Sequence, residues 1–204
     1  MHLAGKRANA LSHPVILDPV GAGASGWRRE AALGLLEEVK CAVIRGNASE
    51  IKALALGRGG AAGVDADLAD EITPQNLEKM TAFAKAFAEK TGAVVAVSGP
   101  IDVVTDGGQT ILLRNGCATM ARITGSGCML TSLLGAFCGA DPGHPFEATC
   151  AAIAAMGVAG DLAEERRLRN GTGNATFRTD LIDAVFNLTE EQLNGRVRYE
   201  VYEG

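Results

Sequence analysis

The segment TGSGC at 124–128 is the part of this chain whose composition most directly suggests chemistry. An apolar stretch at 129–137 follows it and predicts a helix. Gly125 and Gly127 leave backbone amides free to converge at the amino end of that helix, where the macrodipole favours negative charge. The segment therefore predicts either an anion-binding loop or a tight turn in which glycine supplies a positive φ.

Cys128 opens this expected helix and has two interpretations. It is either a small buried apolar residue or a thiol whose anion the helix end favours and that points into a cleft. Cys138 and Cys150 lie deep in apolar helical runs, so we expect them to be packing residues.

Two acids and one arginine lie where an expected strand ends or an expected helix begins. Asp18 and Arg45 each follow a short aliphatic run, and Glu50 lies in the first turn of a predicted helix. Asp18 and Glu50 offer the hard oxygen atoms that Mg²⁺ prefers, and Mg²⁺ is usually held by one or two carboxylates together with substrate phosphates. The planar cation of Arg45 suits phosphate oxygens. The alternatives are a turn residue for Asp18, an ordinary first-turn helix acid for Glu50 and a surface salt bridge for Arg45.

The loop GAGASG at 21–26 matches the pattern G-x-G-x-x-G of dinucleotide-binding folds. That pattern should follow its strand directly, and an acid should close the next strand. Here Asp18 and Pro19 intervene, and the next strand ends at Arg45. The sequence therefore does not favour a nicotinamide cofactor.

Short aliphatic runs alternate with longer helical patterns along the chain. Strands are expected at 15–17, 42–44 and 94–97, a hairpin at 103–113, helices at 29–40, 48–57 and 75–90, a loop at 58–74, a mostly helical last third, and an edge strand at 197–201. This order predicts a single α/β domain over 1–204 with a largely parallel sheet. Because ligands of such sheets bind beyond the carboxyl ends of the strands, the positions of interest are 18, 45–50, 98–102 and 124–128.

Composition limits the class of protein. The 204 residues are 47% apolar and 21% charged, as in a folded domain rather than a disordered one. A net charge of −5 without a cluster of Lys and Arg argues against nucleic acid as a partner.

Cysteine usage and hydropathy indicate the compartment. Five cysteines with no C-x-x-C pair indicate a reducing, cytoplasmic environment. The apolar stretches at 127–140 and 148–160 are shorter than a membrane span, so they predict buried core helices and no membrane contact.

Four segments together resemble the hydroxyethylthiazole kinase family of the ribokinase-like superfamily. They are ILDPVGAGAS at 16–25, IRGNASEI at 44–51, VSGPIDVVTDG at 97–107 and ITGSGCMLTSLLGAF at 123–137. The resemblance implies a three-layer fold with helices on both faces of the sheet. It also implies transfer of the ATP γ-phosphate to the hydroxyl of 4-methyl-5-(2-hydroxyethyl)thiazole, in thiamine synthesis and salvage.

The resemblance assigns roles to individual positions. It implies that Arg45 and Ser98 contact ATP, that Gly125 contacts the thiazole alcohol, and that Asp18 and Glu50 surround Mg²⁺. It also makes the TGSGC loop the anion hole, with Ser126, Gly127 and Cys128 as the catalytic positions. Many ribokinase-like relatives have an Asp as base where this chain has Cys128. We therefore expect Mg²⁺, Arg45 and the loop amides to supply the rate, with Cys128 orienting the alcohol and acting at best as a weak base.

The family is usually trimeric, with its thiazole pockets between subunits, so the resemblance implies a homotrimer. Its members normally begin with a further segment that walls the thiazole pocket. We expect this sequence to start after that segment, which would leave the strand at 15–17 on an exposed edge.

Two alternatives stay open at this point. One is a noncatalytic remnant that binds nucleotide but has no alcohol site. The other is another ribokinase-like enzyme or small-molecule kinase, which Cys128 disfavours because such relatives tend to have Asp there.

Overall fold

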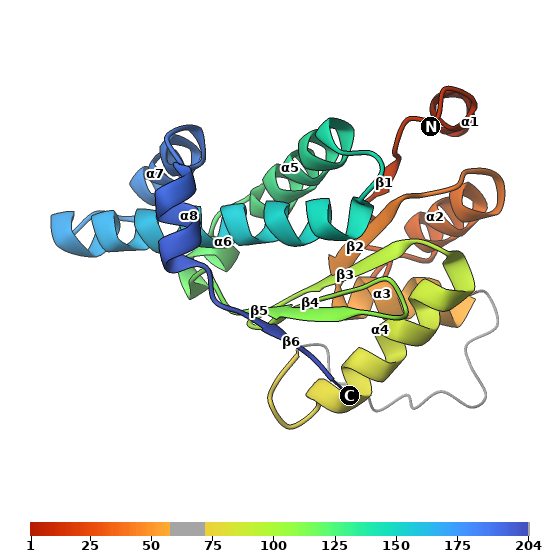
Figure 1. Ribbon diagram of the computed structural model, residues 1–204, viewed down its shortest axis with the longest axis horizontal. Helices are drawn as coiled ribbons and strands as arrows, with labels where there is room; N and C mark the ends of the chain where they lie inside the picture. Colours follow the sequence, from red (N-terminus) through yellow and green to blue (C-terminus); the bar gives the residue numbers. More distant parts are fainter. Residues whose placement is uncertain (58–71, 204) are drawn as a thin grey trace.

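The computed structural model describes residues 1–57 and 72–203, and these residues form one mixed sheet with helices on both faces (Figure 1). The strand order is β1-β2-β3-β4-β5-β6. The strands are β1 (Ile16–Leu17), β2 (Val43–Asn47), β3 (Val94–Ser98), β4 (Asp102–Thr105), β5 (Thr110–Leu113) and β6 (Tyr199–Val201).

The first three strands pair in parallel, and the remaining pairings are antiparallel. Strands β1, β2, β3 and β5 consequently point the same way, which confirms the expected α/β sheet. The hairpin β4–β5 and the edge strand β6 also match the expectation. β1 lies at the opposite edge of the sheet and has β2 as its one strand partner among the described residues.

The helices form the two outer layers (Figure 1). On one face lie α2 (Gly26–Glu38), α3 (Ala48–Leu56) and α4 (Leu77–Thr91). On the other face lie α5 (Ser126–Ala140), α6 (Pro145–Asn170) and α7 (Asn174–Phe186). The helices α1 (His2–Ala10) and α8 (Glu190–Arg196) and the short 3-10 helix η2 (Ala118–Arg122) complete the described chain. The three-layer arrangement is confirmed.

Side chains alternate between the two faces along each strand, which is what a pleated strand dictates. In β2, Val43 joins the core under α5 and α6, whereas Ile44 joins the core under α3 and α4. In β3, Val94 and Ala96 face the first core and Val95 faces the second. This alternation decides which polar residues at the strand ends share a face.

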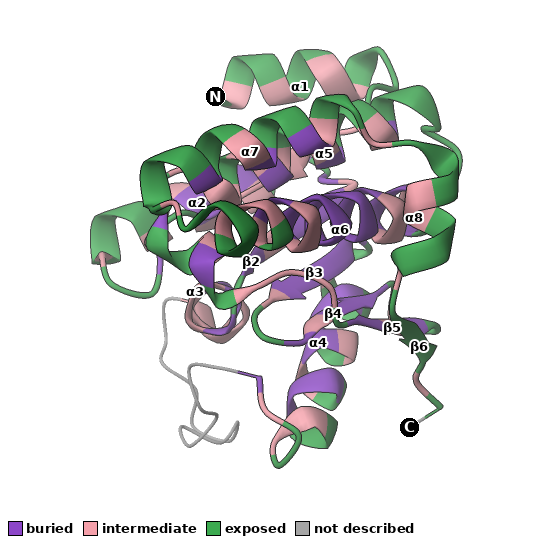
Figure 2. Ribbon diagram, turned by 90° about the vertical axis from the view of Figure 1, so that its left-hand side faces the viewer, coloured by how far each residue is buried: buried purple, intermediate pink, exposed green. Residues whose placement is uncertain are grey.

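Helix α6 is the central helix of its layer (Figure 2). By length and apolar composition it could cross a membrane, but 72% of its apolar window is buried inside the protein. Its small residues allow close contact with the sheet, and the expectation of a core helix at 148–160 is confirmed. The expectation for 127–140 was only partly right, because α5 buries one stripe, Leu130, Leu134 and Cys138, and exposes much of its other side.

One strand is longer than expected. Arg45, Gly46 and Asn47 were expected to end the strand that begins near residue 42, yet they belong to β2 and pair with the final residues of β3. The expected loop at 58–74 falls mostly on residues 58–71, which lie outside the described residues. Helix α4 is ended by Gly92 in a left-handed conformation (φ 66°), which glycine adopts readily.

Leu134 offers a test of the α5–α6 layer because its side chain is fully buried. We expect Leu134→Ala to lower the free energy of unfolding by about 2–5 kcal/mol, since it removes buried methyl groups and leaves a cavity. Urea denaturation measures this loss. The matched control is Leu168→Ala on α6, whose side chain is 65% exposed, and its effect should stay within about 0.5 kcal/mol. Equal losses in the two variants would contradict this packing.

Candidate functional site

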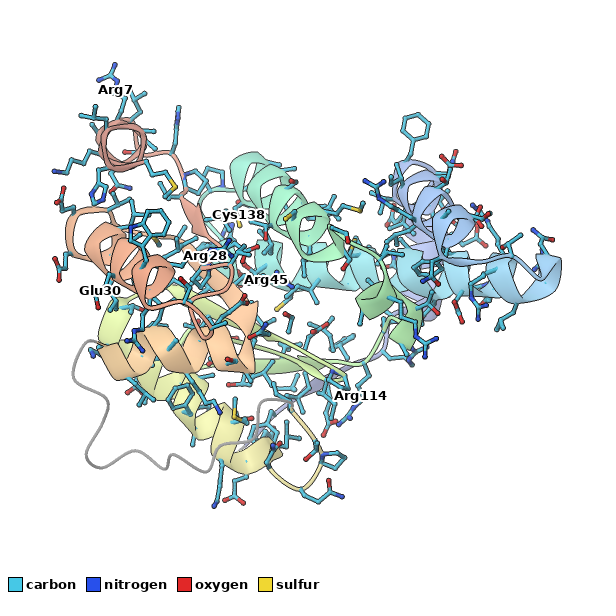
Figure 3. The ribbon with its side chains drawn as sticks, turned by 180° about the vertical axis from the view of Figure 1, so that it is seen from behind. Arg7, Arg28, Glu30, Arg45, Arg114 and Cys138 are labelled. Carbon is cyan, nitrogen blue, oxygen red and sulfur yellow. The ribbon has the colours of Figure 1, made fainter. Side chains whose placement is uncertain are left out.

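Polar side chains from three parallel strands meet at one edge of the sheet, on the face covered by α5 and α6. Asp18 follows β1, Arg45 lies in β2 and Ser98 ends β3. Each is two residues beyond a side chain of the α5–α6 core, namely Ile16, Val43 and Ala96. The two-residue period of a strand therefore places all three polar groups on that face. Arg45 points from β2 toward these helices (Figure 3).

The guanidinium of Arg45 is held by partners from both neighbouring strands. Its Nη1 donates to Asp18 Oδ2 at 3.3 Å, and its Nη2 donates to Ser98 Oγ at 2.9 Å. The Ser98 hydroxyl in turn donates to the carbonyl of Gly46 at 3.3 Å. The side chains of Arg45 and Asp18 are only 13% and 11% exposed, so this is a largely buried ion pair. The structure thus excludes the surface salt bridge as the explanation of Arg45.

Two atoms of this ion pair have no hydrogen-bond partner among the described residues. They are Arg45 Nε and Asp18 Oδ1, and both are buried. The other carboxylate oxygen, Asp18 Oδ2, also accepts a 2.6 Å hydrogen bond from Thr131 Oγ1 on α5. A buried polar atom without a hydrogen-bond partner is costly. The pair therefore has one donor and one acceptor that still need a partner, which a bound ligand or ion would supply.

Helix α5 brings the TGSGC segment against Arg45. Gly125 precedes the helix with φ 96°, a conformation that favours glycine, and Ser126 begins it. A Cβ on Gly127 would lie 2.9 Å from Arg45 Nη1, so the guanidinium packs against the bare backbone of the first turn. The arginine and the amino end of α5 therefore present positive charge to the same space.

Cys128 is not the small buried residue that one of its two interpretations predicted. Its side chain is exposed, and it does not line the cavity beside Arg45. The α-helical repeat explains this placement, because Gly127 and Cys128 face directions about 100° apart on the helix. Cys138 is buried and Cys150 is half-buried, and burial raises the pKa of the Cys150 thiol to about 12, which fits the packing role expected for both.

Glu50 binds two backbone amides. Its Oε2 accepts from Asn47 N at 2.9 Å and completes a capping box at the start of α3. Its Oε1 accepts from Gly21 N at 2.8 Å, which ties the GAGAS turn to this helix. Glu50 is thus the first-turn helix acid that the sequence also allowed, and it additionally fixes the turn that follows Asp18.

A cavity of about 510 Å³ adjoins Arg45. Arg45, Ser98, Ser126 and Gly127 line one part of it. The rest is lined by Gly99, Pro100 and Asp102, by most of the segment 115–121 and by residues of α5 and α6 that include Leu130, Ile153 and Met156. The cavity therefore has a cationic end and an apolar end, as a ligand with a charged and an apolar part requires. Gly125, Asp18 and Glu50 are not among its lining residues.

Sequence reasoning gave no role to two polar residues of this region, Asp102 and Thr131. Asp102 lines the cavity and accepts a hydrogen bond from Gly99 N at 2.9 Å. It lies within the window 98–102 after β3, and that window was the sequence signal from which it could have been identified. Thr131 lies four residues after Gly127, and that helical spacing would have placed it on the face of α5 toward the strand ends.

Burial raises the pKa of Asp102 to about 7, against smaller opposing effects of the Gly99 amide and Arg45. An acid whose pKa is raised in the folded state stabilises the fold below its unfolded pKa of 3.8 and loses that contribution as pH rises through about 7.

We therefore expect Asp102→Asn to be more stable than the parent protein at pH 7.5, with the difference shrinking toward pH 4. Asparagine keeps an acceptor for Gly99 N but cannot ionise. Urea unfolding at pH 4, 5.5 and 7.5 measures the difference. The exposed Asp183→Asn is the control and should show no such trend. A stability difference for Asp102→Asn that stays constant with pH would contradict the raised pKa.

The donor set can be compared with what a divalent cation needs. Among the described residues, no three His, Cys, Asp or Glu side chains gather to form a self-contained metal site. Asp18 offers its unpartnered, buried Oδ1, and Glu50 of α3 accepts a hydrogen bond from Gly21 N in the turn that follows Asp18. One or two carboxylates completed by phosphate oxygens is the usual arrangement for Mg²⁺, so these residues fit that ion when phosphate is also present.

The chain matches known proteins over nearly its whole length. Residues 1–191 match the family model described as the hydroxyethylthiazole kinase family. The chain is 51% identical to hydroxyethylthiazole kinase of Clostridium acetobutylicum, over 98% of this chain and 72% of that protein. It is 43% identical to hydroxyethylthiazole kinase of Clostridium tetani, over 96% of this chain and 70% of that protein.

Solved structures of other proteins also resemble this chain. The hydroxyethylthiazole kinase protein of Pyrococcus horikoshii OT3 superposes with a TM-score of 0.82 at 30% identity, over 98% of this chain and 70% of that one. The pyridoxal kinase of Staphylococcus aureus, solved with pyridoxal, gives a TM-score of 0.53 at 22% identity, over 78% of this chain and 57% of that one, and shows the shared fold. With the buried arginine at the strand ends, the glycine turn before α5 and these matches together, the chain belongs to the hydroxyethylthiazole kinase family.

Proposed function

We propose that the protein transfers the γ-phosphate of ATP to the hydroxyl of 4-methyl-5-(2-hydroxyethyl)thiazole. The observation that carries this proposal is the buried guanidinium of Arg45, which lies between Asp18, Ser98 and the bare first turn of α5. Phosphoryl transfer depends mainly on positioning and on neutralising charge on the phosphoryl oxygens. A fixed arginine beside a helix amino end supplies both.

The cavity beside Arg45 supports a position for the nucleotide. The phosphates lie at its cationic end, near Arg45, Ser98 and the amides of Ser126 and Gly127. The base lies against the apolar part, near Ile153 and Met156. In this arrangement Arg45 Nε donates to a phosphate oxygen and gains the hydrogen-bond partner that it lacks among the described residues.

The other side of the glycine turn supports a position for the acceptor. Gly125 and Cys128 do not line the nucleotide cavity, and Cys128 is exposed at the start of α5. The thiazole alcohol then approaches the turn from the side opposite the nucleotide, with Gly125 as its contact. Cys128 orients its hydroxyl, and the amides at the amino end of α5 stabilise the transferred phosphoryl group.

Mg²⁺ is the cofactor that we propose, held by Asp18 and Glu50 directly or through water. When bound, it neutralises charge on the phosphate oxygens. Asp18 carries out a second task whether or not the ion is present, because its Oδ2 fixes the Arg45 guanidinium and the Thr131 hydroxyl.

Several further properties belong to the same proposal. The reaction serves thiamine synthesis or salvage, and the enzyme works in the cytoplasm, which suits five free cysteines. A homotrimer would cover the side of the turn where Cys128 is exposed, together with the exposed Trp27 and Val20 of the neighbouring GAGAS region. Neither nucleic acid nor a membrane is part of the proposal.

The direct test is release of ADP from ATP and Mg²⁺, measured by a coupled assay with and without the thiazole alcohol. We expect release that depends on the thiazole, and slower or no release with pyridoxal as a competing acceptor. Nucleotide binding without thiazole-dependent release would instead indicate a noncatalytic binding protein of this fold. Faster release with pyridoxal would indicate a different small-molecule kinase.

Arg45→Gln should lower kcat/KM by roughly 10²–10³, the usual effect of removing one preorganised group that stabilises charge. Glutamine retains polar contacts for Asp18 and Ser98 and so limits the loss of fold. The matched control is Arg114→Gln, which also breaks one arginine–carboxylate pair, with Glu200, but whose side chain is half-exposed and does not line the cavity. If both variants kept parental activity while remaining folded, Arg45 would not bind phosphate.

Cys128→Ser should retain measurable turnover, because we assign the thiol an orienting role. A general base contributes about 10²–10⁴ to the rate, so a loss of that size would identify Cys128 as an essential base. Cys128→Asp should turn over at least as fast as the parent, since a carboxylate is a better proton acceptor at neutral pH. Single-turnover kinetics with saturating ATP separate these effects from substrate binding.

A further inference from the structure

One wall of the nucleotide cavity is a stretch of chain without regular strand or α-helix. It runs from Asn115 through Gly116 to the 3-10 helix η2, and most of its residues line the cavity. Gly116 has φ 105°, a backbone conformation that favours glycine. Because β5 ends at Leu113, no strand ladder fixes this stretch, and its position must come from side chains.

Asp161 of α6 supplies two of those contacts, although it does not line the cavity. Its Oδ1 accepts from Gly116 N at 3.0 Å, and its Oδ2 accepts from Asn115 Nδ2 at 2.7 Å. The Asp161 side chain is 16% exposed, so these charge-assisted hydrogen bonds are largely shielded from water.

The C-terminal part of the chain holds the same stretch from the other side. Asn115 Nδ2 also donates to the carbonyl of Arg196 at 2.9 Å, and Asn115 Oδ1 accepts from Arg198 N at 2.6 Å. Arg198 reaches back with its guanidinium to Asp161 at 3.1 Å and to the carbonyl of Arg114 at 2.9 Å. Asn115 is therefore hydrogen-bonded both to Asp161 of α6 and to the segment 196–198, which joins α8 to β6.

Gly157, one turn before Asp161 on α6, lets Asn115 approach the helix closely. A Cβ at this position would lie 2.7 Å from Asn115 Cβ and 3.0 Å from its carbonyl carbon. Backbone and β-carbon cannot yield as a flexible side chain can, so Asn115 rests directly on the helix. Gly157 also lines the cavity, and a shift of Asn115 would change the width of the cavity at that point.

We propose that Asp161 and Asn115 are positioning residues that set the wall of the nucleotide cavity and thereby the affinity for ATP. This inference rests on the proposed function, because it takes the cavity to be the nucleotide site. Asp161 acts through the 115–116 backbone and does not touch the ligand.

The test compares Asp161→Ala, Asp161→Asn and the control Glu165→Gln. Glu165 lies four residues after Asp161 on α6 and forms an ion pair with Arg196. Glu165→Gln therefore also removes a contact between α6 and the C-terminal segment, but it removes no contact with residues 115–116. Steady-state kinetics give KM for ATP and kcat. Calorimetry gives nucleotide affinity, and amide hydrogen exchange reports on 115–121.

Asp161→Ala should raise KM for ATP roughly tenfold, the equivalent of one lost charge-assisted hydrogen bond, and leave kcat within about twofold. Exchange over 115–121 should become faster. Asp161→Asn keeps an acceptor for Gly116 N and should recover part of the affinity, whereas Glu165→Gln should match the parent protein. If Asp161→Ala does not fold, Asp161→Asn carries the same comparison at a smaller expected shift.

Two results would overturn the inference. One is faster exchange over 115–121 with unchanged nucleotide affinity, and the other is an equal loss of affinity in Glu165→Gln. Failure of the proposed function looks different, because the parent protein itself would then bind no nucleotide or release no ADP with the thiazole.

Discussion

The buried ion pair between Arg45 and Asp18 is the interaction on which the candidate site depends. Removing one partner from such a pair costs about 3–5 kcal/mol, because the other charge stays buried without compensation. The pair is therefore retained only where surrounding groups stabilise it, here Ser98 on the arginine and Thr131 on the aspartate. Asp18 and Ser98 together fix the guanidinium in one orientation, so the contacts that stabilise the pair also position the cation.

The sheet explains how residues so far apart in sequence come together. Parallel strands end at one edge, and the two-residue alternation sends every second side chain toward α5 and α6. β4 begins at the same edge with Asp102, and β5 delivers Asn115 there, so the antiparallel half of the sheet also contributes to the cavity. The face toward α3 and α4 receives apolar residues from the same strands and remains a core.

Much of this could be predicted from the sequence, because it rests on local patterns. Aliphatic runs and helical periodicity predicted the strands and helices. Residue types at strand ends singled out Asp18 and Arg45, and the family resemblance singled out Ser98. The extension of β2 to Asn47 could not be predicted, since it depends on pairing with β3. The outward direction of Cys128 and the partners of Asp161 likewise depend on how helices are rotated and where the chain end returns, which local sequence does not encode.

The hydroxyl that completes the carboxylate's environment lies far along the chain. Thr131 follows Asp18 by 113 residues, and β1, which directly precedes the aspartate, is two residues long. During synthesis from the amino terminus, Asp18 and Arg45 leave the ribosome well before α5 does, so the candidate site is assembled after most of the strands have been made. The docking of α5 therefore completes the hydrogen bonds of the ion pair late in synthesis. In an incomplete nascent chain the two charges lack the Thr131 hydroxyl and the cover of α5.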